Sequence, residues 1–220
     1  MNSILPPAEM ILEKLEIDPK SLRSIKSVSE RSQYRAVVNW LTRYSPQSES
    51  ASLELVRGWL EAFHHLCELG AWEKATALLC SRLETATREE LHDQLNLWGY
   101  HAELEQIYSR VVNRVPPKFN GIILNALGRL WTDLGDYEKA IDYHQQSLAV
   151  DEKLGQAQGV GASLGNLGII YASIGDYEKA IDYHQQHLKI AQKIKDVTGQ
   201  GNALSGLGLA HVALGQYKRA

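Results

Sequence analysis

The chain has 220 residues, of which 44% are hydrophobic and 22% are charged. These proportions are close to the average of folded globular proteins, which excludes wholesale disorder, collagen and low-complexity chains. Lys plus Arg number 23 against 26 Asp plus Glu, and the formal net charge of −3 gives no positive field that could hold a nucleic acid or an anionic membrane. No apolar run of about 18 residues occurs, and residues 1–7 lack the pattern of a secretion signal. We therefore expect a cytoplasmic protein that binds neither nucleic acid nor membrane.

Residues 1–50 are predicted to form an N-terminal helical cap. Two amphipathic helices are expected, at Ala8–Leu15 and Ser29–Tyr44, with Pro19 between them and a loop over residues 45–50. Terminal units of helical arrays are atypical and need a polar outer face, which suits this segment.

Residues 51–117 are predicted to form degenerate helical hairpins. One hairpin is indicated by Trp59, Leu66, Gly70 and Leu79, and a second helix pair is expected at 89–97 and 101–115. The spacing of their glycines is irregular. Pro116 and Pro117 predict an extended joint before the regular part of the chain.

Residues 118–220 carry an internal repeat. The sequence GDYEKAIDYHQQ occurs at 135–146 and again at 175–186, and Gly215 opens a third copy, so the period is 40 residues. Segments 121–160 and 161–200 share 19 of 40 residues. Two complete units and a truncated third are therefore expected, in the manner of a repeat architecture.

Each unit is predicted to be a helix, a tight turn and a second helix. Apolar residues recur at helical spacing, as at Leu124, Leu127 and Trp131, and Gly135 and its counterparts are expected to end the first helix. Asp136 can cap the second helix. A single hairpin cannot bury its apolar stripe, so the units should stack. The predicted fold is all-α, a right-handed superhelical solenoid of stacked antiparallel helix hairpins.

Glycines in the middle of the first helices are expected where two helices approach closely. Glycine costs about 1 kcal/mol relative to alanine inside a helix, so these positions need a reason. We expect Gly128, Gly168 and Gly208 to lie against small residues of the paired helix. Those small residues are Ala140, Ala180 and Ala220.

The pattern of Leu-Gly, an aromatic residue or His three positions later, Gly-x-Tyr, and an Ala three positions after that resembles the tetratricopeptide repeat (TPR). The usual TPR period is about 34 residues. The six extra residues are expected in the second helix and in the turns at 153–160 and 193–200. Such long repeats are similar to those of kinesin light chain, of the spindle-orientation adaptor LGN and of bacterial TPR arrays, and the stretch 57–100 resembles cyanobacterial members.

No constellation in the sequence predicts catalysis, a cofactor or a metal site. The glycine-rich runs 159–165 and 199–201 lack the Lys and Ser or Thr of a phosphate-binding loop and are expected in turns. His184 and His187 share a helix face but have no third ligand at helical spacing. The two cysteines, Cys67 and Cys80, are expected to be reduced and buried.

The resemblance implies that the first helices line a concave groove for an extended peptide or a partner helix. Polar residues on these helices are the candidate partner-binding residues, because asparagine can both donate to and accept from a peptide backbone. They are Asn125, Arg129, Asp133, Asn166, Ser173, Asn202 and Ser205. The predicted function is a non-catalytic protein–protein interaction scaffold. The alternative is a regulatory or sensor segment of a larger NTPase, protease or kinase whose catalytic domain lies outside this chain.

The third unit stops at Ala220, one turn into its second helix. Its apolar stripe of Leu204, Leu207 and His211 is therefore expected to lack a partner. An exposed apolar patch favours association. We expect a fragment of a longer array that self-associates weakly, end to end.

Overall fold

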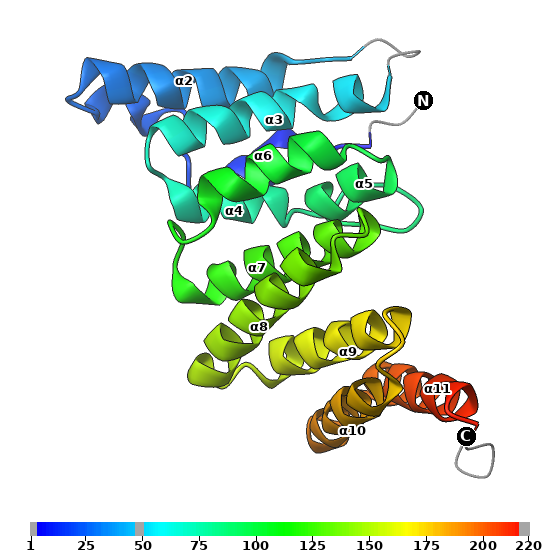
Figure 1. Ribbon diagram of the computed structural model, residues 1–220. Helices are drawn as coiled ribbons and strands as arrows, with labels where there is room; N and C mark the ends of the chain where they lie inside the picture. The colour runs from blue at the N-terminus through cyan, green and yellow to red at the C-terminus, as the bar shows by residue number, and fades with distance from the viewer. Residues whose placement is uncertain (1–3, 47–50, 216–220) are drawn as a thin grey trace. The chain divides into compact units, whose positions relative to one another are not determined.

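The computed structural model describes residues 4–46 and 51–215. The chain divides into two compact units, one reaching Val115 and the other beginning at Pro116 (Figure 1). Both consist of helices, and within the described residues the only β-type pairing is an isolated bridge between Arg82 and Glu90. The predicted all-α class is confirmed. None of the described helices has the length and apolar character needed to cross a membrane.

The described residues of the first unit form six α-helices and a short 3-10 helix. They are α1 (Ala8–Lys14), η1 (Ser21–Ser24), α2 (Val28–Arg43), α3 (Ser52–Glu68), α4 (Trp72–Leu79), α5 (Leu91–Leu97) and α6 (His101–Val111). Helix α3 packs against α2 and α4, and its residues Trp59, Phe63 and Leu66 are buried. The predicted division of this part into a cap over 1–50 and hairpins over 51–117 stays a prediction, and the expected loop at 45–50 lies mostly outside the described residues.

The second unit follows the 40-residue period. Its helices are α7 (Pro117–Asp133), α8 (Tyr137–Leu154), α9 (Ala157–Ser173), α10 (Tyr177–Lys193) and α11 (Val197–Ala213). Consecutive helices pack against one another along this series. Gly135 and Gly175 adopt φ values of +79° and +85°, the left-handed conformation that ends the first helix of each hairpin. The side chains of Asp136 and Asp176 accept hydrogen bonds from the third backbone N–H beyond them, as predicted for helix caps.

The prediction of long inter-repeat turns is wrong. Helix α8 ends at Leu154 and α9 begins at Ala157, so the six extra residues lengthen the helices. Gly155, with φ of +68°, closes α8 in a short turn. The glycines expected in turns, Gly159 and Gly161, lie inside α9.

The glycines of α7 and α9 face histidines of the paired helix. A Cβ atom at Gly128 would lie 2.6 Å from His144 Cε1, and one at Gly168 would lie 2.6 Å from His184 Cε1. The expectation that the nearest neighbours are alanines is therefore wrong, because the imidazole rings fill the space. At Gly208 no described atom lies within 4 Å of a Cβ, and Ala220, its expected partner, lies outside the described residues.

The histidines of α8 and α10 are part of the core between helices. His144 is completely buried and His184 is 3% exposed. The ring of His184 lies between Gly168 of α9 and Gly206 of α11. Packing between the helices therefore accounts for a histidine at this position of both repeats.

Candidate functional site

A groove of about 690 Å³ lies within the second unit. Its lining residues come from α7, α9, α10 and α11 and from the residues joining the last two helices. Part of the candidate set lines the groove: Asn125, Arg129, Asn166, Asn202 and Ser205. Two other candidates do not line it: Asp133 is exposed at the end of α7, and the Ser173 hydroxyl donates to the carbonyl of Ile169 at 2.9 Å.

Two of the asparagines belong to a hydrogen-bond chain that runs from the groove into the core. The Asn166 amide donates to Asn125 Oδ1 at 3.5 Å, and the Asn125 amide donates to Ser163 Oγ at 3.2 Å. Ser163 then donates to Ser147 Oγ at 3.1 Å, which donates to the carbonyl of Gly121 at 2.9 Å. These hydrogen bonds fix the Asn125 side chain at the groove wall, whereas Asn202 is exposed.

This row of hydrogen bonds passes close to a buried carboxylate. Asp151 is 3% exposed, and Ser147 Oγ lies 3.5 Å from its Oδ2. Burial raises the pKa of Asp151 above its ordinary value. Gly121 and Gly159 lie against this carboxylate, and a Cβ atom at either position would collide with it. The glycines of α7 and α9 therefore make room for a polar layer as well as for the histidines.

Two histidines of α10 line the groove. His184 and His187 are 3% and 8% exposed, and in both rings Nδ1 is buried without a hydrogen-bond partner among the described residues. Burial lowers the pKa of both imidazoles, so they are neutral at pH 7. The fixed charges in the lining are then Arg129 and Asp196, one of each sign. The groove offers hydrogen bonds and little net charge.

Apolar side chains accompany these polar groups. Ile169 of α9 and Leu209 of α11 line the groove and are 54% and 69% exposed. Exposed apolar groups beside amides suit a polypeptide, because a peptide presents both backbone hydrogen-bonding groups and side chains.

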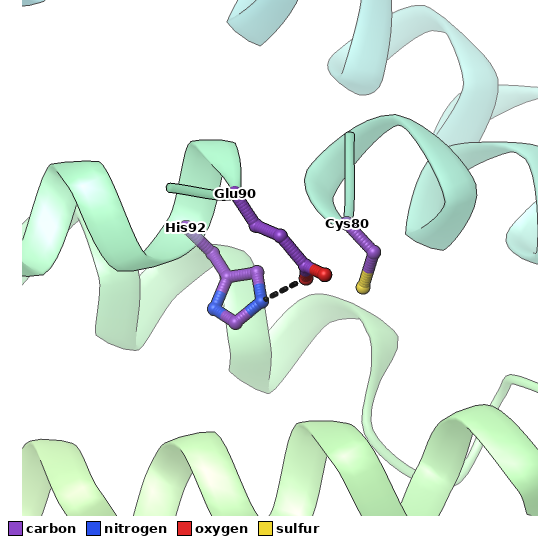
Figure 2. A group of neighbouring side chains, drawn as sticks. All are labelled: Cys80, Glu90 and His92. Carbon is purple, nitrogen blue, oxygen red and sulfur yellow. Dashed lines mark hydrogen bonds and ion pairs between the residues drawn. The ribbon is translucent and has the colours of Figure 1, made fainter. Parts of the chain in front are cut away.

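A second polar cluster lies in the first unit and consists of Cys80, Glu90 and His92 (Figure 2). His92 Nε2 lies 3.0 Å from Glu90 Oε2, and His92 Nδ1 lies 2.9 Å from the Tyr108 hydroxyl. Burial raises the pKa of the Cys80 thiol to about 12, and the nearby Glu90 carboxylate adds to the shift. The thiol is therefore protonated at pH 7.

No pattern in the sequence predicted this cluster. Cys80, which was expected to be buried, is half-buried and borders polar groups, because it follows the last residue of α4. Cys67 is buried as expected. The signal in the sequence is a Cys followed ten residues later by Glu and twelve residues later by His, across a loop whose folding no periodicity reveals.

Comparison with known proteins identifies the repeats of the second unit. A family model described as tetratricopeptide repeat matches residues 120–193 and 160–220. The crystal structure of BtubC (BKLC) from P. vanneervenii is similar over 97% of this chain and 82% of that chain, with a TM-score of 0.68 and 19% identity. At this identity the likeness shows the fold alone. No curated protein matches the chain.

These comparisons confirm the resemblance drawn from Leu-Gly, Gly-x-Tyr and the following Ala, while the similarity to cyanobacterial members stays a prediction. The stacked helix hairpins of the second unit and the similarity to a solved structure along nearly the whole chain agree with a TPR-like solenoid. Residues 120–220 of the chain are tetratricopeptide repeats.

Proposed function

We propose that the chain is a non-catalytic scaffold that binds an extended peptide or a partner helix in the groove of the second unit. Repeats of this family generally mediate protein–protein interactions. The observation that supports the groove as the binding surface is the position of Asn125, Asn166 and Asn202 on three successive first helices along one lining. Their amides can pair with a peptide backbone whatever its side chains are.

The groove chemistry favours a partner of low net charge. Arg129 is its cationic lining residue and Asp196 its acidic one, so neither strongly basic nor strongly acidic segments gain much from it. Ile169 and Leu209 give apolar side chains of the partner a surface to cover.

The test is peptide selection followed by mutation. A displayed library of random peptides is selected against the chain, and the dissociation constants of the enriched peptides are measured by fluorescence anisotropy. The groove variant replaces Asn125, Asn166 and Asn202 with Ala. If each lost contact contributes about 0.5–1.5 kcal/mol, binding should weaken by about tenfold or more.

The matched control replaces three exposed acidic residues of the second helices, Glu138, Asp142 and Asp182, with Ala. It should bind the peptides as the wild type does. Unchanged affinity of a folded groove variant, or a loss in the control variant alone, would move the binding surface out of the groove. The expected cytoplasmic location belongs to this proposal and is checked by fractionating cells.

A further inference from the structure

We propose that Cys80, Glu90 and His92 bind a Zn²⁺ ion in the first unit. One atom from each side chain, the Cys Sγ, a Glu carboxylate oxygen and a His ring nitrogen, lies within 4.8 Å of the other two. A tetrahedral zinc ion with bonds of about 2.0–2.3 Å needs its ligand atoms roughly 3.5 Å apart. Small side-chain rotations are therefore enough to close the three groups around one ion (Figure 2).

The backbone holds the two segments of the site together. Leu83 N donates to the carbonyl of Glu89 at 2.8 Å, and Leu91 N donates to the carbonyl of Ser81 at 3.0 Å. These bonds join the residues that follow α4 to the start of α5. Cys80 and Glu90 are thus held side by side although ten positions separate them in the chain.

The orientation of His92 matches that of a metal ligand. Its ring is buried, its Nε2 points to the carboxylate of Glu90, and its Nδ1 contacts the Tyr108 hydroxyl of α6 at 2.9 Å. Histidine ligands usually hydrogen-bond through their second nitrogen, which fixes the ring and its tautomer. With Nδ1 donating to Tyr108, the lone pair of Nε2 is available to an ion.

The ligand set selects the metal and leaves one coordination position open. Thiolate and imidazole together favour Zn²⁺ over Mg²⁺ or Ca²⁺, which prefer oxygen ligands. Cys80 also lines a cavity of about 810 Å³ in the same unit, so water or an exogenous ligand can reach the fourth position. Binding releases the thiol proton to solvent and leaves a thiolate and a carboxylate, whose two negative charges balance the ion.

Neighbouring charges tune the site in opposite directions. Lys14 Nζ donates to the Cys80 carbonyl at 3.3 Å and to Ser81 Oγ at 2.8 Å, and its positive charge opposes a cation. Asp93 Oδ1 lies 3.8 Å from His92 Nδ1 and favours one. The two charges therefore act on a bound cation with opposite sign.

The test uses the full chain without any affinity tag, freed of metal by a chelator. Titration with Co²⁺ alone should produce the absorption band of a cobalt–thiolate bond, reaching an end point at one ion per chain, and Zn²⁺ should then abolish the band. Cys80→Ser should remove the band and weaken Zn²⁺ binding at least tenfold, and Glu90→Gln should also weaken it. Cys67→Ser is the matched control, because it removes the other thiol and should leave the band intact.

Tyr108→Phe distinguishes a metal site from a hydrogen-bonded cluster. It removes the hydroxyl that orients His92 and should weaken Zn²⁺ binding by about 10- to 100-fold without removing a ligand. Circular dichroism of each variant establishes that it is folded. A band that survives Cys80→Ser, or equal Zn²⁺ affinity of the wild type, Cys80→Ser and Glu90→Gln, would overturn the proposal.

Discussion

Gly168 and Gly208 occupy the same position of successive repeats but differ in their surroundings. A Cβ atom at Gly168 would lie 2.6 Å from His184 Cε1, whereas no described atom lies within 4 Å of one at Gly208. The His184 ring is 3% exposed and has Gly206 on another side, so it has little room to move away. Comparing the same substitution at Gly168 and Gly208 therefore separates the effect of packing on stability from that of helix propensity.

Both Gly168→Ala and Gly208→Ala gain about 1 kcal/mol of helix propensity, which cancels in the comparison. Only Gly168→Ala adds the cost of overpacking, typically about 1–3 kcal/mol. We therefore expect Gly208→Ala to be the more stable variant by about 1–3 kcal/mol in urea unfolding followed by circular dichroism. Equal stabilities, within roughly 0.5 kcal/mol, would refute the account of the mid-helix glycines.

Three further results are expected. Burial, helped by repulsion from Arg129, lowers the pKa of His144 to about 4. The contribution of the neutral ring to the free energy of unfolding is therefore present above the unfolded pKa of about 6.5 and is lost as the pH falls toward 4. At about 1.4 kcal/mol per unit this amounts to roughly 3 kcal/mol, and His144→Leu should remove that share of the acid sensitivity in urea unfolding at pH 7 and pH 4. Asn125→Ala should cost about 1 kcal/mol in urea unfolding, because Ser163 loses a bonded donor, and Asn202→Ala should cost almost nothing. Leu204 and Val212 of α11 are 57% and 43% exposed, so light scattering should show weak association that Leu204→Gln with Val212→Gln reduces; a strictly monomeric wild type would contradict this.

The repeat was predictable from the sequence, because each unit has a glycine at its turn, Gly135 or Gly175, followed by an aspartate that caps the next helix. Both features depend only on neighbouring residues: the glycines adopt a positive φ, and the aspartates accept a hydrogen bond from a backbone N–H three residues later. The role of Gly159 was not readable, because it depends on Asp151 of the preceding helix packing against it. Glycine spacing alone does not distinguish a turn from a close helix contact.

Part of the lining of the groove was predictable from the sequence. The resemblance indicated which helices face the groove, and Asn125, Asn166 and Asn202 line it. It did not indicate His187, whose burial depends on the small residues of the neighbouring helix. The cluster around Cys80 was beyond prediction, because it depends on how the irregular loop between α4 and α5 folds back on itself.

The measurement closest to the central claim is a nuclear magnetic resonance titration of the ¹⁵N-labelled chain with a selected peptide. The side chains of Asn125, Asn166 and Asn202 line the groove, so their amide signals report contact with the peptide directly. We predict that these signals shift as the peptide is added, while backbone amides around Asp142 and Asp182 on the second helices stay in place. Shifts confined to the outer faces of α8 and α10, with the asparagine signals unchanged, would contradict the account.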